Sequence, residues 1–121
     1  AYVYDGFKRP CPFAPDIVID IDSVIQRKLD ALACHVSQVY EWLPYNRQEL
    51  DQVPTDPAAR REWMGAWYGR RFSQAADQYR PLLVERYGSE RGSAVRYAEA
   101  LEISEYGGEL SPDEIHELLP W

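Results

Sequence analysis

The chain has 121 residues, of which 45% are hydrophobic and 13% aromatic, so it can bury one hydrophobic core as a single domain. Thirteen basic residues against 20 acidic ones give a net charge of −7, which argues against nucleic acid as a partner because backbone binding depends on Lys and Arg. No apolar run approaches the roughly 18–20 residues that span a bilayer, and no signal-peptide pattern opens the chain. We therefore expect a soluble, cytoplasmic protein with no membrane partner.

Two β-prone runs occupy the first part of the chain, at residues 2–4 (Tyr-Val-Tyr) and 17–21 (Ile-Val-Ile-Asp-Ile). A loop that contains Gly6 and three prolines separates them, so two short strands are predicted. The apolar run at residue 1 also indicates that the sequence begins inside a fold. Cys11 and Cys34 lack the C-x-x-C spacing of a structural zinc site, and reduced thiols are expected.

A long amphipathic helix is predicted from 23 to 43. Ser23 with Gln26 three residues later has the form of a capping box, and Pro44 cannot continue the helix. Apolar residues recur at steps of three and four, which is typical of one helical stripe. The stripe consists of Ile25, Leu29, Leu32, Val36, Val39 and Leu43.

More helix follows. Asp56 and Pro57 have the form of a helix start, and a second helix is predicted from there to Tyr79, although Gly65 and Gly69 weaken its middle. A short helix from 81 to 87 should end at Gly88.

Two further elements close the chain. Alternating apolar residues predict a strand over 95–103. Ser111 and Glu114 have capping-box spacing and predict a final helix over 112–118. The order of elements indicates an α/β fold in a single domain, without showing which strands pair.

His35 and Gln38 are the first candidate site residues. On a helix they share a stripe beside the core stripe, about 100° away from it. Two interpretations are open: a partly buried histidine satisfied by its neighbours, or a pair at the edge of a polar pocket. Ser37 lies two positions from His35 and faces another way, which argues against nucleophilic catalysis by this pair.

Glu99 is the second candidate, because it falls on the same face of the predicted last strand as the apolar residues Val95, Tyr97, Leu101 and Ile103. A carboxylate on an apolar face is costly unless it is paired, so it should meet a cation or a backbone donor, or open into a cleft. An ion pair with Arg70, Arg71 or Arg96 is one interpretation, and a role in a pocket is the other.

Aromatic side chains give a third signal. Aromatic faces stack on the apolar faces of sugars, so such a cluster is typical of a sugar-binding groove, although core or interface packing is the alternative. The cluster consists of Trp42, Trp63, Trp67, Tyr68 and Tyr79.

Three segments closely resemble, in order, the C-terminal third of LmbE/PIG-L de-N-acetylases. The central one resembles the H-x-S-Q helix of that family: Lys28-Leu-Asp-Ala-Leu-Ala-Cys-His35-Val-Ser37-Gln38-Val-Tyr-Glu41-Trp42-Leu-Pro44-Tyr45. Pro15-Asp16-Ile-Val-Ile-Asp20-Ile resembles the strand before that helix, and Arg96-Tyr97-Ala98-Glu99-Ala100 resembles the closing Tyr-x-Glu-x strand. The resemblance covers residues 1 to about 104, and the ordered run is more specific than any one segment.

The resemblance implies a Rossmann-like α/β hydrolase that uses one zinc ion to activate water against the acetamide of N-acetylglucosamine-type sugars. The family takes its zinc ligands and its general base from an N-terminal His-Pro-Asp-Asp motif and a later histidine, which lie upstream of the part matched here. No catalytic residue and no metal ligand therefore transfers to this chain. His35, Gln38 and Glu99 match family positions, which implies a supporting or substrate-binding role.

The chain alone offers His35, His116 and two isolated cysteines, with no three-ligand zinc motif. We therefore expect no stoichiometric zinc and no deacetylation from it by itself. One hypothesis is a portion of a larger zinc deacetylase that acts on an N-acetylated sugar. The other is a non-catalytic binding or assembly module. Either one predicts association with the missing N-terminal part or with a second copy, because a few strands leave sheet edges that need covering.

Overall fold

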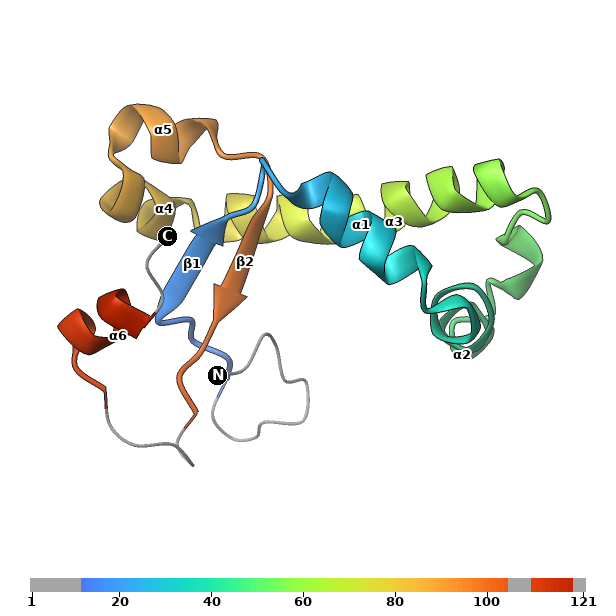
Figure 1. The fold of residues 1–121 in the computed structure, drawn as a ribbon, viewed down its shortest axis with the longest axis horizontal. Helices are drawn as coiled ribbons and strands as arrows, with labels where there is room; N and C mark the ends of the chain where they lie inside the picture. The colour runs from blue at the N-terminus through green and yellow to red at the C-terminus, as the bar shows by residue number, and fades with distance from the viewer. Residues whose placement is uncertain (1–11, 105–109, 119–121) are drawn as a thin grey trace.

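The computed structural model describes residues 12–104 and 110–118. The fold is mixed α/β and mostly helical, with a two-stranded antiparallel sheet (Figure 1). The helices and strands are β1 (Ile17–Asp20), α1 (Ile25–Ala33), η1 (Gln38–Trp42), α2 (Leu43–Asn46), η2 (Leu50–Gln52), α3 (Pro57–Gln78), α4 (Arg80–Tyr87), α5 (Ser89–Ala94), β2 (Ala98–Leu101) and α6 (Pro112–Leu118).

The sheet joins two segments that are far apart in sequence. β1 pairs antiparallel with β2, with Ile17 opposite Leu101 and Ile19 opposite Glu99. The predicted strand at 17–21 is confirmed, and the one at 95–103 is shorter than expected. The strand predicted at 2–4 lies outside the described residues. The α/β class is confirmed at this level, and the finer Rossmann-like arrangement stays a prediction.

The predicted continuous helix over 23–43 is wrong. α1 ends at Ala33, and the chain continues through a turn into η1, a π-helix in which the Leu43 N–H donates to the Gln38 carbonyl. A wide π turn interrupts the regular backbone ladder just before Pro44, whose nitrogen has no hydrogen to donate. The break rotates the apolar stripe, so Val36 is 49% exposed while Val39 and Tyr40 are buried.

The capping box predicted at Ser23 is also absent. α1 starts after Val24 without a side-chain cap. The neighbouring Asp22 is used instead: its carboxylate accepts hydrogen bonds from the backbone N–H groups of Arg96 and Tyr97, with the Tyr97 nitrogen 2.6 Å from Asp22 Oδ1. Asp22 therefore ties the end of β1 to the start of β2.

α3 is the longest element, and its prediction is confirmed. It starts at Pro57, and the Asp56 carboxylate accepts a hydrogen bond from the Ala59 N–H at 2.9 Å, as expected of a helix cap. Gly65 and Gly69 lie inside this helix without ending it. α4 follows closely, also as predicted, and ends at Gly88 with a φ of 82°, which favours glycine.

α5 was not predicted, and it packs tightly against α4. A Cβ atom added to Gly92 would lie 2.4 Å from the Leu83 carbonyl oxygen and 2.5 Å from the Val84 Cα. Only a residue without a side chain allows the two backbones to approach this closely. Arg80 reinforces the arrangement by donating to the carbonyl of Val95 at 2.6 Å.

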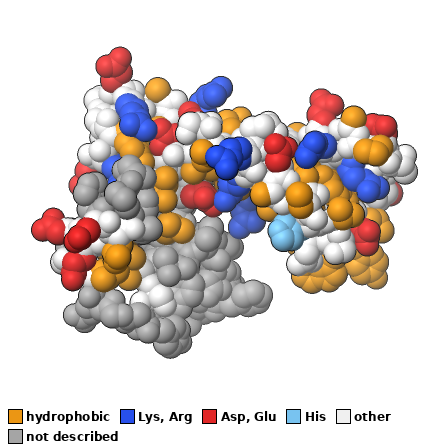
Figure 2. Space-filling view, in the orientation of Figure 1, with side chains coloured by type: hydrophobic (Ala, Val, Ile, Leu, Met, Phe, Trp, Pro, Cys, Tyr) orange, Lys and Arg blue, Asp and Glu red, His pale blue; other side chains and the backbone are white. Residues whose placement is uncertain are grey.

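Two hydrophobic cores lie along α3. The first surrounds the sheet and contains Val18, Ala76, Leu83, Val95, Ala98 and Ala100. The second contains Val39, Tyr40 and Met64, where burial raises the pKa of the Tyr40 hydroxyl above its ordinary value. Because Met64 and Ala76 both belong to α3, this helix connects the two cores. Figure 2 shows the hollow that lies between these two parts of the molecule.

The capping box predicted before α6 is present. The Ser111 N–H and hydroxyl both lie 2.8 Å from Glu114 Oε2, and the Glu114 N–H lies 3.3 Å from the Ser111 hydroxyl oxygen. These bonds, above all the one from the backbone N–H, lower the pKa of the Glu114 carboxyl.

Glu114 should therefore titrate below the ordinary range of a glutamate in a carboxyl-detected NMR titration. The cap stabilises α6 above the unfolded pKa, and its contribution is lost as the pH falls through the lowered folded pKa. Ser111→Ala removes the hydroxyl and leaves the backbone donor, so the Glu114 pKa should rise part of the way. An unchanged Glu114 pKa in this variant would contradict the role of the hydroxyl.

Within the described ranges, no helix is both long and apolar enough to cross a membrane.

Candidate functional site: a groove beneath α3

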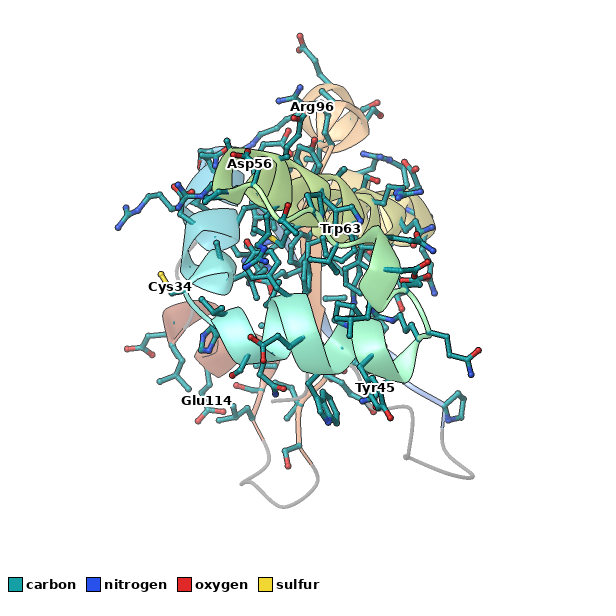
Figure 3. The ribbon with its side chains drawn as sticks, turned by 90° about the vertical axis from the view of Figure 1, so that its right-hand side faces the viewer. Cys34, Tyr45, Asp56, Trp63, Arg96 and Glu114 are labelled. Carbon is teal, nitrogen blue, oxygen red and sulfur yellow. The ribbon has the colours of Figure 1, made fainter. Side chains whose placement is uncertain are left out.

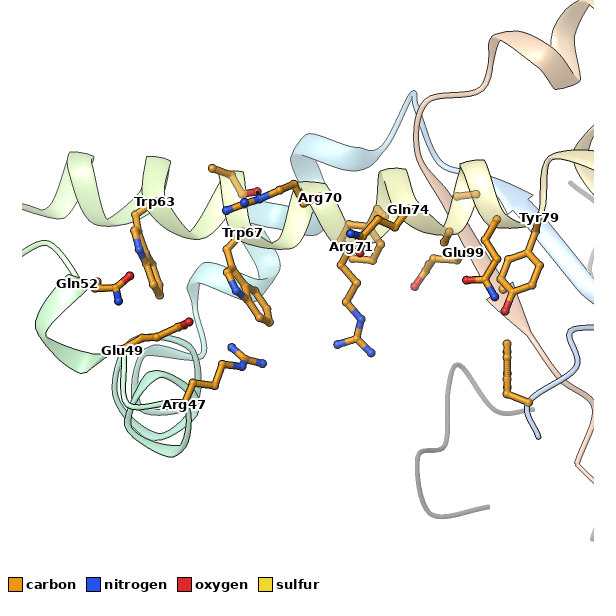
Figure 4. Close-up of a pocket in the computed structure, with 17 residues that line it drawn as sticks. Arg47, Glu49, Gln52, Trp63, Trp67, Arg70, Arg71, Gln74, Tyr79 and Glu99 are labelled. Carbon is orange, nitrogen blue, oxygen red and sulfur yellow. Dashed lines mark hydrogen bonds between the residues drawn. The ribbon is translucent and has the colours of Figure 1, made fainter. Parts of the chain in front are cut away.

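A groove of about 830 Å³ runs along one side of α3, between the sheet and the segment that follows α2 (Figure 4). Its walls come from α3, from η2 and the loop that precedes it, and from β2. The residues that line it are Phe13, Arg47, Glu49, Gln52, Trp63, Ala66, Trp67, Arg70, Arg71, Phe72, Gln74, Ala75, Gln78, Tyr79, Ala98, Glu99 and Ala100.

Aromatic rings supply much of the apolar lining. Trp63 and Trp67 are one helical turn apart on α3, so both project toward the groove, and Figure 4 shows them side by side. Tyr79 lies at the other end, where Phe13 meets its ring edge-on at 6.5 Å between centroids. Three members of the predicted aromatic cluster therefore line one groove.

The other two members of that cluster lie elsewhere. Tyr68 packs against the second core, with its ring 4.6 Å from that of Trp67. Trp42 is 55% exposed and is not a lining residue. Figure 3 shows Trp63 on the inner side of α3, whereas Tyr45, in α2, points away from the body of the protein.

Glu99 lies on the wall of the groove and is paired. Lys28 Nζ lies 2.6 Å from Glu99 Oε1, and both side chains are partly buried. The ammonium group also lies 5.1 Å from the ring centroid of Phe72, another lining residue. The prediction that Glu99 meets a cation or opens into a cleft is confirmed on both counts, but the arginines named as partners are wrong.

Glu99 shares its face of β2 with Leu101, as predicted, but the prediction that this is the core face is wrong. Ala98 and Ala100 are the buried residues of β2, and Glu99 points to the opposite, half-buried side. Val95 is buried, but residues 95–97 precede β2 instead of belonging to it. The alternation predicted from Val95 therefore does not show which face of β2 is buried. Glu99 therefore projects from the outer face of β2 toward Lys28 and the groove.

His35 and Gln38 lie outside the groove lining. The turn after α1 leaves both side chains exposed, so they flank the break between α1 and η1 instead of sharing a stripe with the core. His35 is therefore not the partly buried histidine of the first interpretation. It does not line the groove either. Ser37 is exposed beside them. The functional roles inferred for His35 and Gln38 from the family resemblance stay predictions.

Arginine side chains form the polar part of the groove. The Arg47 guanidinium lies 3.8 Å from the ring centroid of Trp67, close enough for a cation–π contact. Arg70 and Arg71 come from α3, and Figure 4 shows Arg47 and Arg71 extending into the space beneath the helix. Sequence patterns did not single out Arg47, because only the turn after α2 brings it back under α3.

The described residues contain no group of three or more His, Cys, Asp or Glu side chains that could hold a metal ion. Cys34 is exposed and free, and Cys11 lies outside the described ranges. A tetrahedral zinc site needs at least three protein ligands, so the residues seen here do not fit a zinc centre by themselves.

Comparison with protein-family models, curated proteins and solved structures gives no match to this chain.

Proposed function

We propose that this chain is the C-terminal portion of a zinc-dependent hydrolase that removes acetyl groups from N-acetylglucosamine-type substrates. In this proposal the groove beneath α3 forms part of the sugar-binding side of a Rossmann-like enzyme. The zinc ligands and the general base would come from residues outside this chain, and zinc would activate the water that attacks the acetamide.

The observation that carries the proposal is a contact between the three segments that resemble the de-N-acetylases. The first forms β1, the second begins on α1, and the third forms β2. β1 and β2 pair directly, with Ile19 opposite Glu99, and Lys28 of α1 binds Glu99 at 2.6 Å. The two strands and α1 thus form one connected unit, as parts of one ancestral fold should.

The chemistry of the groove supports a sugar as its occupant. Its volume lies within the roughly 300–1,000 Å³ that is typical of small-molecule sites. Trp63 and Trp67 offer aromatic faces for the apolar face of a pyranose, while Gln52, Gln74 and Glu99 offer hydrogen-bond partners for hydroxyl and amide groups. These residues would bind and orient the sugar, and none of them is assigned a catalytic step.

The test uses the open reading frame that encodes this chain, expressed from its own start codon and loaded with zinc. Release of free amine from N-acetylglucosamine derivatives should be detected, and a chelator should abolish it. If the zinc-loaded protein binds N-acetylated sugars without releasing amine, the result would instead support the non-catalytic module. If the protein neither binds these sugars nor releases amine, a sugar-directed function loses its support.

A further inference from the structure

Large apolar side chains remain exposed on the outer face of η1 and α2, outside the groove. Trp42 is 55% exposed and Tyr45 is 68% exposed. They are three positions apart in one helical stretch, so their side chains are neighbours on its surface. Leu50 is 45% exposed and lines a hollow of about 760 Å³ together with Tyr45.

We name Trp42, Tyr45 and Leu50 the outer patch. Figure 2 shows hydrophobic side chains gathered at this end of the molecule, and in Figure 3 Tyr45 points away from its body. Single exposed apolar residues are ordinary on a protein surface, but a group of neighbouring ones marks an interaction site. The outer patch is therefore a candidate docking surface, and its surroundings indicate the partner.

Carboxylates that are not neutralised flank the outer patch. Glu41 is exposed four positions before Tyr45 on the same helical stretch, and Asp51 lines the hollow beside Tyr45. Neither carboxylate forms an ion pair with another described residue. Between the start of η1 and the end of η2, Arg47 is the only basic residue, and its guanidinium lies over Trp67 in the groove. The patch is therefore apolar at its centre and negative at its rim.

This charge argues against two other occupants. A symmetric contact between two copies uses the same surface on both, so it would place these carboxylates opposite other carboxylates. An anionic lipid surface would be repelled for the same reason. A polypeptide with Lys or Arg around apolar side chains matches both features, because its cations meet the carboxylates while its apolar side chains cover the aromatic rings.

We propose that the outer patch is a docking surface for a basic, amphipathic helical segment of a partner protein. The apolar side of that segment covers the two aromatic rings, one of its apolar side chains enters the hollow, and its Lys or Arg side chains bind Glu41 and Asp51. Gln38 is exposed four positions before Trp42, so it lies at the rim of the patch, where it can donate or accept a hydrogen bond. This interaction does not depend on the sugar site proposed above.

The probes are synthetic peptides of about 15 residues, near the shortest length that stays helical in water. All have leucine at helical spacing, and the remaining positions are lysine in the first peptide, glutamine in the second and glutamate in the third. None contains tryptophan, so the indole N–H resonances of the ¹⁵N-labelled chain report where each peptide binds. The lysine peptide should shift the Trp42 resonance and leave those of Trp63 and Trp67 nearly unchanged. It should bind about three- to tenfold more tightly than the glutamine peptide, as for two exposed ion pairs, and the glutamate peptide should bind most weakly.

One pair of variants tests the aromatic anchor. Trp42→Ala should weaken binding of the lysine peptide about tenfold or more, as truncation of an aromatic anchor in an interface does. Because Trp42 is exposed, the melting temperature of this variant should stay unchanged. Leu82→Ala is the matched control, since Leu82 is an exposed apolar residue of α4 outside the patch, and its peptide affinity should equal that of the unmodified chain.

A second pair tests the charges. Glu41→Gln combined with Asp51→Asn should remove most of the advantage of the lysine peptide over the glutamine peptide. Glu85→Gln combined with Glu90→Gln removes the same amount of charge from exposed positions on α4 and α5, so it should leave most of that advantage in place.

Several results would overturn this inference. If the lysine peptide causes no saturable shift of the Trp42 resonance, or if the glutamate peptide binds as tightly, the surface does not select a basic segment. Shifts confined to Trp63 and Trp67 would place the peptide in the groove instead. If light scattering shows self-association that Trp42→Ala abolishes, a second copy is the occupant. Binding to phosphatidylcholine vesicles that Trp42→Ala abolishes would assign the patch to a lipid surface.

Discussion

Gly92→Ala adds one carbon atom and should strongly lower the free energy of unfolding. The added Cβ would lie 2.4 Å from the Leu83 carbonyl oxygen, 2.6 Å from the Leu83 carbonyl carbon and 2.5 Å from the Val84 Cα. All three are backbone atoms of α4, so no side chain can rotate away, and α5 must separate from α4. We expect a loss at or above the upper end of the roughly 1–3 kcal/mol that overpacking costs. Chemical denaturation monitored by circular dichroism measures it.

Gly69→Ala is the matched control. Gly69 lies inside α3, and a Cβ atom added there would meet nothing within 4 Å. Because alanine is the better helix former, this variant should be more stable by about 0.5–1 kcal/mol. The two alanine substitutions should therefore change stability in opposite directions. Equal stability of the two variants would show that α4 and α5 do not pack as closely as described.

Met64→Ala should have the second large effect. Met64 is 1% exposed and packs with Val39 and Tyr40 in the core that joins α3 to η1. Truncating a buried methionine removes apolar contacts and leaves a cavity, which costs about 2–5 kcal/mol in the free energy of unfolding. The expected result is a matching fall in the denaturation midpoint at unchanged slope.

Met64→Leu conserves most of the volume and should cost less than about 1.5 kcal/mol. The pair of variants separates loss of packing from loss of the methionine itself. If Met64→Ala lowers stability no more than Met64→Leu does, the core around η1 can fill the space left by Met64 at no cost in stability. The packing that places the turn at Arg47 under α3 would then be in doubt.

Local signals in the sequence predicted much of the helical structure. Three of these signals rest on hydrogen bonds or backbone angles within a few residues: Asp56 followed by Pro57, the spacing of Ser111 and Glu114, and the helix end at Gly88. Such signals do not depend on tertiary packing, so they hold in the folded protein. The β-branched run at 17–21 was equally local.

Other features depend on packing between distant segments and were missed for that reason. The hydrophobic stripe across 23–43 predicted one helix, but α1 ends at Ala33, and after this break Val36 is exposed while Tyr40 is a core residue. α5 is short and contains Gly92, which has the lowest helix propensity apart from proline. Its helix depends on contact with α4.

In the candidate site too, local signals were predicted and features that depend on distant packing were not. An acidic residue among apolar ones signalled that Glu99 needed a partner, and the structure provides Lys28, 71 positions away. Aromatic spacing on α3 indicated the wall formed by Trp63 and Trp67. The position of Arg47 depends on how η1 and α2 fold back, which no spacing pattern encodes. His35 and Gln38 were placed by assuming a continuous helix, and the break moved them to the surface.

The central claim is that the groove beneath α3 binds an N-acetylated sugar, and the tryptophan indole N–H resonances of the ¹⁵N-labelled chain test it most directly. Trp→Phe variants assign each resonance, and N-acetylglucosamine is the titrant. Trp63 and Trp67 line the groove, whereas Trp42 is exposed outside it. We predict saturable shifts of the Trp63 and Trp67 resonances with that of Trp42 unchanged. A shift confined to Trp42, or no shift of any indole at saturating sugar, would contradict the claim.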